Sequence, residues 1–162
     1  MTQKRIGQGH DLHRLEAGGP LRLCGIDVDA PFEAVGHSDA DVGIHALVDA
    51  LLGAAQLGDI GRTFPDTDPA HADANSADLL WEVHNRVRSL GWRIENVDLT
   101  IHLERPRLAP YASQFAARLG GITNVTPYRF NVKAKTAEGL GPVGDSAAVA
   151  ADCVVLLTKM GR

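Results

Sequence analysis

The chain has 162 residues, of which 44% are hydrophobic and 22% charged, and its formal net charge at pH 7 is -4. This length fits one ordinary domain, so we expect a single domain over residues 1–162 without a separate cofactor-binding module. The negative charge excludes a general attraction for polyanions. Neither nucleic acid nor a membrane is therefore expected as a partner.

The start of the chain carries basic residues but no apolar stretch behind them. The longest apolar run, around residues 154–157, is far too short to span a bilayer. Cys24 and Cys153 lie in apolar, strand-like runs without metal-ligand spacing, which favours reduced core cysteines. These features predict a cytoplasmic protein.

In the first half of the chain, strands are expected over residues 5–9 and 21–29, with a turn or bulge at Gly25. Helical spacing of apolar residues predicts a helix over residues 39–55. Ser38 is expected to cap this helix, because Asp41 follows at capping-box spacing. Residues 58–75 are rich in loop-forming residues and too long for a simple connection.

In the second half, a helix is expected over residues 76–90, with Gly91 ending it. Strict alternation from Val97 to Leu103 predicts a half-buried strand. A third helix is expected over residues 110–119, before Gly120 and Gly121. Further strands are expected near residues 129–135 and 148–158, so the order of elements is mixed α and β.

One short segment suggests metal chemistry. Asp11 and His13 are two residues apart and would project the same way from an extended chain, so they could share a cation. His45, within the first helix, could supply a third ligand and leave a fourth tetrahedral position open, as in catalytic zinc sites. His10 and His37 are competing ligands that spacing does not exclude. An Asp-x-His pair is common by chance, and the residues alone leave this choice open.

Several motifs follow one another in a fixed order: Gly7-x-Gly9-x-Asp11-x-His13, His37-Ser38-Asp39-Ala40-Asp41-x-x-x-His45, Gly58-Asp59-Ile60-Gly61, Phe64-Pro65-Asp66-Thr67-Asp68, Asn131-Val132-Lys133-Ala134 and Glu138-x-Leu140-Gly141. In order and spacing they resemble the 2-C-methyl-D-erythritol 2,4-cyclodiphosphate synthase family. The resemblance covers nearly the whole chain and rests on independent motifs.

The resemblance implies an α+β fold, with a mixed sheet that carries helices on one face. It also implies a homotrimer whose sheets pack around the threefold axis, with active sites between subunits. The implied enzyme is a phosphorus-oxygen lyase of the non-mevalonate isoprenoid precursor pathway. It would convert 4-diphosphocytidyl-2-C-methyl-D-erythritol 2-phosphate to the 2,4-cyclodiphosphate with release of CMP.

The implied cofactors are one zinc ion, held by Asp11, His13 and His45, and a magnesium or manganese ion held by Glu138 and bridging the substrate phosphates. The 2-phosphate oxygen would attack the β-phosphorus. Because this nucleophile is already an anion, folding the substrate and neutralising charge matter more than a strong base. His37 and Thr136 are implied to stabilise the transition state.

The resemblance also implies the substrate contacts. One loop would hold the methylerythritol hydroxyls, and two further segments, from a neighbouring subunit, would form the cytosine pocket. The implied substrate-binding residues are Asp11, Leu12, His13, His37, Ser38, Asp59, Ile60, Gly61, Phe64, Pro65, Asp66, Thr67, Asp68, Leu103, Glu104, Arg105, Pro106, Arg107, Leu108, Ala109, Lys135, Thr136, Ala137 and Glu138.

Simpler explanations exist for these segments. Glu138 could be a solvated charge in a glycine-rich turn, and the loop from Asp59 to Asp68 uses residues that tight turns use anyway. Arg105 and Arg107 could be solvated in a loop between a strand and a helix. Two rival functions stand against the implied lyase: a zinc-dependent phosphoester hydrolase that uses the same open metal site, and a non-enzymatic trimeric ligand-binding module.

The chain departs from the family pattern at two places. Lys135 stands where the family commonly has Thr, and could add a cationic contact to phosphate. Asp145 to Ala148 replace a common Arg-Gly-Glu-Gly run, whose Arg helps hold anionic ligands in a cavity on the threefold axis. Because Asp145 would repel a diphosphate, we do not expect such binding here.

Overall fold

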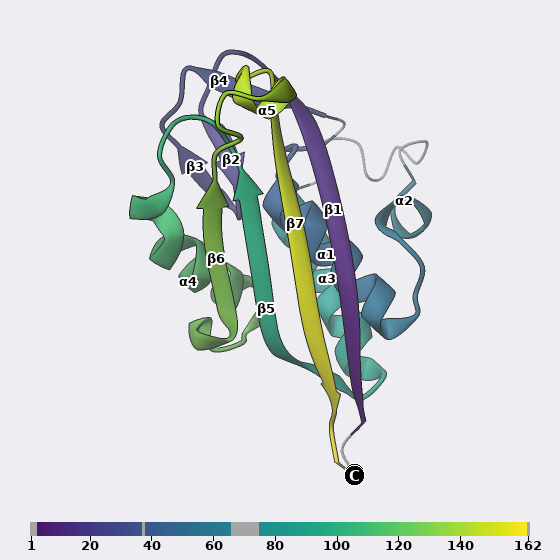
Figure 1. The fold of residues 1–162 in the computed structure, drawn as a ribbon. Helices are drawn as coiled ribbons and strands as arrows, with labels where there is room; N and C mark the ends of the chain where they lie inside the picture. Colours follow the sequence, from purple (N-terminus) through teal and green to yellow (C-terminus); the bar gives the residue numbers. More distant parts are fainter. Residues whose placement is uncertain (1–2, 37, 66–74, 162) are drawn as a thin grey trace.

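The structure of this chain, a computed structural model, describes residues 3–36, 38–65 and 75–161. Its main sheet has five strands in the order β4-β1-β7-β5-β6 (Figure 1). Their bounds are β1 (Lys4–Ala17), β4 (Phe32–Val35), β5 (Trp92–His102), β6 (Phe130–Lys135) and β7 (Ala148–Lys159). The pair β5 and β6 is parallel and the other neighbouring pairs are antiparallel, so the sheet is mixed.

The longer helices cover one face of this sheet, and the other face carries none of them (Figure 1). They are α1 (Val42–Ala55), α3 (Ser76–Ser89) and α4 (Ala112–Thr123). Shorter elements are α2 (Ile60–Thr63), α5 (Gly141–Gly144), the 3-10 turns η2 (Ala109–Tyr111) and η3 (Pro127–Arg129), and the two-stranded sheet of β2 (Leu21–Leu23) and β3 (Ile26–Val28). The expected α+β class is confirmed. None of the described helices is long and apolar enough to cross a membrane.

Most expected elements are present, but several differ in extent and some were not expected. The first strand continues to Ala17, well past Gly9, and β4 was not expected at all. The turn expected at Gly25 does separate β2 from β3. Helix α4 runs through Gly120 to Thr123, because Asn124 takes the left-handed conformation that ends it. Both cysteines are buried and free, as expected.

The start of α1 differs from the expectation. Asp41, not Ser38, is the capping residue, and the helix begins at Val42. The fully buried Asp41 carboxylate accepts hydrogen bonds from the backbone nitrogens of Ile44 (3.0 Å), Cys24 (2.8 Å) and Gly25 (2.6 Å). It therefore joins the helix start to the β2–β3 turn, a contact that local sequence spacing does not reveal.

Helix α1 lies directly against the backbone of β1. A Cβ atom added to Gly9 would lie 2.0 Å from the carbonyl oxygen of Ala46, and one added to Gly7 would lie 1.9 Å from that of Ala50. Two residues along the strand cover about 6.6 Å, and four residues along the helix cover about 6.0 Å. Successive glycines of β1 therefore meet successive turns of α1. The glycines of the Gly-x-Gly-x-Asp-x-His motif are thus packing residues.

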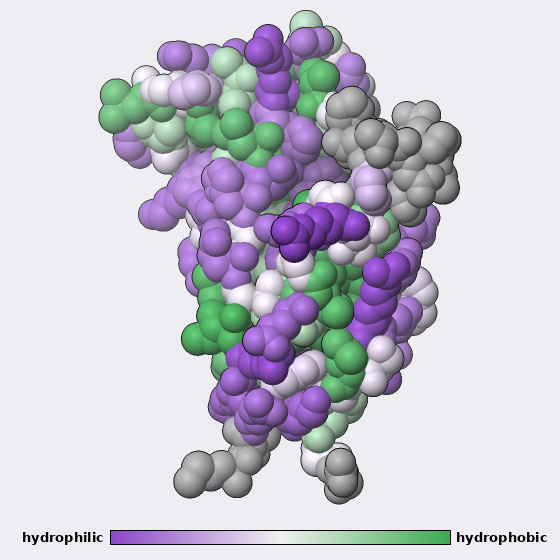
Figure 2. Space-filling view, turned by 90° about the vertical axis from the view of Figure 1, so that its right-hand side faces the viewer, coloured by the Kyte–Doolittle hydropathy of each residue, from purple (hydrophilic) through white to green (hydrophobic). Residues whose placement is uncertain are grey.

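The face of the sheet without helices exposes apolar side chains. Ile6 is 73% exposed, Leu12 55% and Val154 46%. On the same face, the Asp152 carboxylate receives hydrogen bonds of 2.8 Å from both His10 and His102. On the side of the molecule that Figure 2 shows, hydrophobic residues are interspersed with hydrophilic ones.

We predict that Gly9→Ala lowers the free energy of unfolding by about 3 kcal/mol or more, because the methyl group meets a helix backbone that cannot yield easily. Gly53→Ala, in α1 at a position with open space around the added carbon, is the matched control. It should raise stability by about 0.5–1 kcal/mol through helix propensity. Urea denaturation measures both, and an unchanged midpoint for Gly9→Ala would contradict the packing argument.

Candidate metal centre and pocket

Asp11, His13 and His45 meet at the point where β1 passes the first turn of α1; we call them the metal triad. Asp11 Oδ2 lies 3.1 Å from His13 Nε2 and 2.9 Å from His45 Nδ1. The two ring nitrogens are 3.3 Å apart. Ligand atoms around a tetrahedral zinc ion lie about 3.3 Å from one another. The three atoms therefore have the spacing of one triangular face of such a site.

The hydrogen bond of His13 to the backbone decides which ring nitrogen is available. His13 Nδ1 lies 2.9 Å from the carbonyl oxygen of Val35 in β4. A carbonyl only accepts, so Nδ1 carries the hydrogen. In the neutral imidazole the lone pair is then on Nε2, which faces Asp11 and His45.

His45 is oriented by a relay, that is, a chain of hydrogen bonds through Ser76 to Asp39. Ser76, the first residue of α3, donates its hydroxyl hydrogen to Asp39 Oδ1. The Ser76 oxygen can then accept from His45 Nε2, 2.8 Å away, and Ser38 Oγ lies 3.2 Å from the same nitrogen. With its hydrogen on Nε2, His45 turns the lone pair of Nδ1 toward Asp11. Second partners of this kind fix the ligand histidines of metal sites.

The electrostatics fit a cation. Burial alone would raise the pKa of Asp11, but when His13 and His45 are protonated, their hydrogen bonds and charges outweigh burial and hold the pKa well below its usual value. A metal ion would take the place of these protons. Two lone pairs and a carboxylate that converge within 3.3 Å repel one another unless a positive charge lies between them. One carboxylate and two imidazoles form a donor set that zinc accepts.

His10, the competing candidate, lies on the opposite face of β1 and bonds Asp152. His37 lies outside the described residues, as do Asp66, Thr67 and Asp68. Sequence reasoning missed Ser76, Asp39 and Val35 as orienting groups, because their roles depend on contacts between distant elements. The only available signal was Asp39 within the motif that contains His45.

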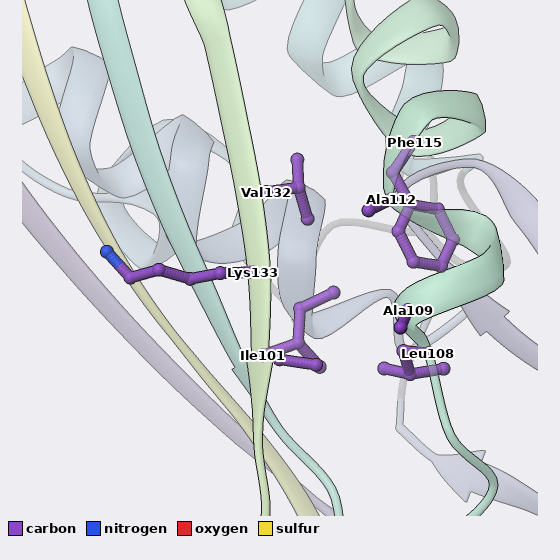
Figure 3. Close-up of a pocket in the computed structure, with 8 residues that line it drawn as sticks. Ile101, Leu108, Ala109, Ala112, Phe115, Val132 and Lys133 are labelled. Atoms are coloured by element: carbon purple, nitrogen blue, oxygen red, sulfur yellow. The ribbon is translucent and has the colours of Figure 1, made fainter.

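A separate cavity of about 270 Å³ opens between α4 and the strands β5 and β6 (Figure 3). Its wall is mostly apolar, with Phe115 from α4, Ile101 from β5 and Val132 from β6. Leu108 and Ala109, both expected near a cytosine base, also line it. Lys133 points away from the cavity in Figure 3 and donates to Asp98 at 2.6 Å.

The two segments expected to form the base pocket lie side by side. Leu103 N donates to the carbonyl oxygen of Lys135 (2.9 Å), and Ala137 N donates to the Glu104 carboxylate (3.0 Å). Thr136 donates its hydroxyl hydrogen to Glu138 at 2.8 Å.

The described part of the expected hydroxyl-binding loop has structural contacts of its own. Asp59 caps α2 by accepting from the backbone nitrogen of Arg62 at 2.9 Å. Ile60 N donates to Asp49, and Phe64 is 5% exposed and belongs to the core.

The fold and the metal triad together define an α+β protein with three side chains that could hold one metal ion and leave a fourth tetrahedral position open. The comparisons with known proteins agree. A family model described as the YgbB family matches residues 4–158. The 2-C-methyl-D-erythritol 2,4-cyclodiphosphate synthase of Bordetella pertussis is 47% identical over 97% of each chain. That of Symbiobacterium thermophilum is 49% identical over 94% of this chain and 97% of its own.

Solved structures give the same result. A 2C-methyl-D-erythritol-2,4-cyclodiphosphate synthase superposes with a TM-score of 0.87 at 42% identity, covering 94% of this chain and 99% of that one. A further structure of such an enzyme, equally similar, is of the form bound to CDP. The bifunctional IspDF of Campylobacter jejuni gives a TM-score of 0.94 at 34% identity. The match covers 99% of this chain and 43% of the bifunctional chain. The chain belongs to the YgbB family, that of the 2-C-methyl-D-erythritol 2,4-cyclodiphosphate synthases.

We predict that Ser76→Ala weakens zinc binding about 10- to 100-fold, because His45 loses the partner that fixes its ring. Ser89→Ala, at the other end of α3 and exposed, is the matched control and should bind zinc as the unaltered chain does. Competition with a chromophoric chelator measures both affinities. Equal affinities for the two variants would show that the relay from Asp39 does not orient the ligand.

Proposed function

We propose that this chain converts 4-diphosphocytidyl-2-C-methyl-D-erythritol 2-phosphate to 2-C-methyl-D-erythritol 2,4-cyclodiphosphate and CMP, as a phosphorus-oxygen lyase of the non-mevalonate isoprenoid pathway. The converging metal triad is the observation that carries the proposal, together with membership of the family. An oxygen of the 2-phosphate bonds to the β-phosphorus, the bond from that phosphorus to the α-phosphate oxygen breaks, and CMP leaves with the electron pair.

Two cations fit the residues present. Asp11, His13 and His45 would hold zinc, which supplies Lewis acidity to a phosphate oxygen when bound. The Glu138 carboxylate would hold magnesium or manganese, which takes most of its remaining ligands from phosphates and water. Glu138 is exposed at a turn, where its neighbour Thr136 donates a hydrogen bond to the carboxylate and holds it in place.

The protein's own residues hold the substrate in a folded shape. The apolar cavity beside Leu108 and Ala109 would bury the cytosine, and the backbone groups of residues 103–109 would recognise its edge. Asp59, Ile60 and Gly61, with residues 64–68, would bind the methylerythritol hydroxyls. Ser38 lies beside the triad, and Leu12 would contribute through its backbone, which runs between Asp11 and His13. Holding both ends brings nucleophile and phosphorus together, which removes most of the entropic cost of cyclisation. His37, Thr136 and Lys135 would then donate to the charged phosphates.

The distance between these parts supports active sites shared between subunits. Asp11 and His13 of the triad lie on β1, whereas residues 135–138 lie at the end of β6 and just beyond it, three strands away in the sheet. Three strand spacings amount to about 14 Å. A second copy that brings its own β6 edge to the triad would place both parts against one small substrate.

The exposed apolar face supports a trimer with sheets packed around its axis. Ile6, Leu12 and Val154 project from the face that carries no long helix. Covering such side chains removes apolar surface from water, which stabilises the assembly by about 25 cal/mol for each Å² buried. A ring of three copies would cover this face and bring each triad to a neighbour's pocket.

We predict that a chelator or the substitution His45→Ala abolishes CMP release from the cytidylyl substrate, because the triad loses its cation. Zinc added back together with magnesium should restore the chelated enzyme but not the variant. Chromatography of the products, run in water labelled with ¹⁸O, distinguishes the rival hydrolase. Linear products that contain labelled oxygen would contradict the cyclase proposal and support the hydrolase. Unlabelled cyclic diphosphate supports the cyclase.

We predict that Glu138→Gln lowers kcat at least about 100-fold, in line with the loss of a group that stabilises transition-state charge, and leaves zinc affinity unchanged. Glu82→Gln, an exposed glutamate on α3, is the matched control. Unchanged activity in Glu138→Gln would favour the simple reading of this residue as a solvated charge.

Mixing two inactive variants tests the shared site. Homotrimers of His45→Ala and of Glu138→Gln are each expected to be inactive. After unfolding and refolding together in equal amounts, about a quarter of the sites should combine an intact triad with an intact neighbouring pocket. Recovered activity near that level confirms sites between subunits, and no recovery from a refolded trimer contradicts them.

A further inference from the structure

A second cavity, of about 290 Å³, lies at the other end of the sheet from the metal triad. It is located where α3 and α4 end and β5 begins, and Arg88, Arg93 and Arg129 line it together with Thr126. Arg93 pairs with Thr158 of β7 in the sheet, whereas Asp11 pairs with Ala151. Seven residues along β7 correspond to about 23 Å, so this cavity does not belong to the triad.

The cavity has more positive than negative charge. Glu95 is the acidic residue that the described structure places beside these arginines, and its Oε2 lies 3.5 Å from both Arg93 Nη2 and Arg129 Nη1. These contacts are loose, and Oε2 makes no hydrogen bond to a described residue. Arg88 has no ion-pair partner among the described residues. Because three guanidinium groups lie beside one carboxylate, the net charge of these four side chains is +2.

A buried imidazole also lines this cavity. His84 is 2% exposed, and its buried Nδ1 has no hydrogen-bond partner among the described residues. Burial, with the charge of Arg88 adding to it, lowers the pKa of His84 to about 4. His84 is therefore neutral at pH 7 and carries an N–H group for which the described residues supply no acceptor. Buried polar atoms normally have partners.

Helix electrostatics explain only part of this arrangement. Arg88 lies in the last turn of α3, where a cation stabilises the negative end of the helix. Arg93 and Arg129 lie on other elements, however, and neither lies in the last turn of a helix longer than three residues. The dipole argument also leaves the buried nitrogen of His84 without a partner.

We propose that this cavity binds the phosphate group of a small molecule. The two excess positive charges match a phosphate dianion, and guanidinium forks suit its oxygens geometrically. The Thr126 hydroxyl and the His84 imidazole supply further donors. The volume fits a diphosphate or a small phosphate ester, and the net charge of -4 for the whole chain disfavours a long polyanion.

Calorimetric titration of the full chain with inorganic pyrophosphate, and separately with glycerol 3-phosphate, tests the proposal. Arg88→Gln should weaken binding about tenfold, the effect of one lost hydrogen bond to a charged group. Arg86→Gln is the matched control, because Arg86 lies on the same helix but pairs with Glu82. Affinity for pyrophosphate alone identifies a free anion as the ligand, and affinity for the ester identifies a phosphorylated metabolite.

A second measurement does not depend on how well the variants fold. In the unaltered protein, NMR titration of the His84 ring should show its pKa rising when pyrophosphate is present, because a bound anion favours the charged imidazole. The proposal is overturned if neither anion binds at millimolar concentration. It is also overturned if Arg88→Gln binds as Arg86→Gln does, or if the pKa of His84 is unmoved by pyrophosphate.

Discussion

The close approach of α1 to β1 is the constraint on which the rest of the structure depends. Gly7 and Gly9 have no side chains, so the helix backbone lies directly on the strand and the two elements advance in step. Side chains on a helix lean toward its N-terminus, so His45 is directed to the place where β1 passes the helix start. Asp11 and His13 meet it there without a long or flexible connection.

Orientation of the ligands depends on residues distant in the chain. The Val35 carbonyl fixes His13, and the relay from Asp39 through Ser76 fixes His45. These contacts join β4 and α3 to the triad, so elements that supply no ligand still determine where the ligand lone pairs point. Because Ser76 begins α3, the packing of that helix and the geometry of the metal site are coupled.

Periodicity in the sequence was sufficient for the longer helices and for β5, because each buries one face with its own period. It did not show that β1 continues beyond Gly9. It was not sufficient for β4, which has only four residues, or for the start of α1, where Asp41 bonds the distant turn at Cys24 and Gly25. The triad followed from residue types and motif resemblance. Its orienting groups did not, because no local spacing encodes a contact between β1 and β4 or between α1 and α3.

Successive side chains of β1 project to opposite faces of the sheet, so each position serves one face only. Odd-numbered residues from Gly7 to His13 face the helix, and Asp11 and His13 supply two ligands of the metal triad. Even-numbered residues such as Ile6, His10 and Leu12 face the opposite side. A single inserted or deleted residue would exchange these two sets completely. A substitution in this stretch therefore changes one surface of the sheet, whereas a change in its length changes both surfaces at once.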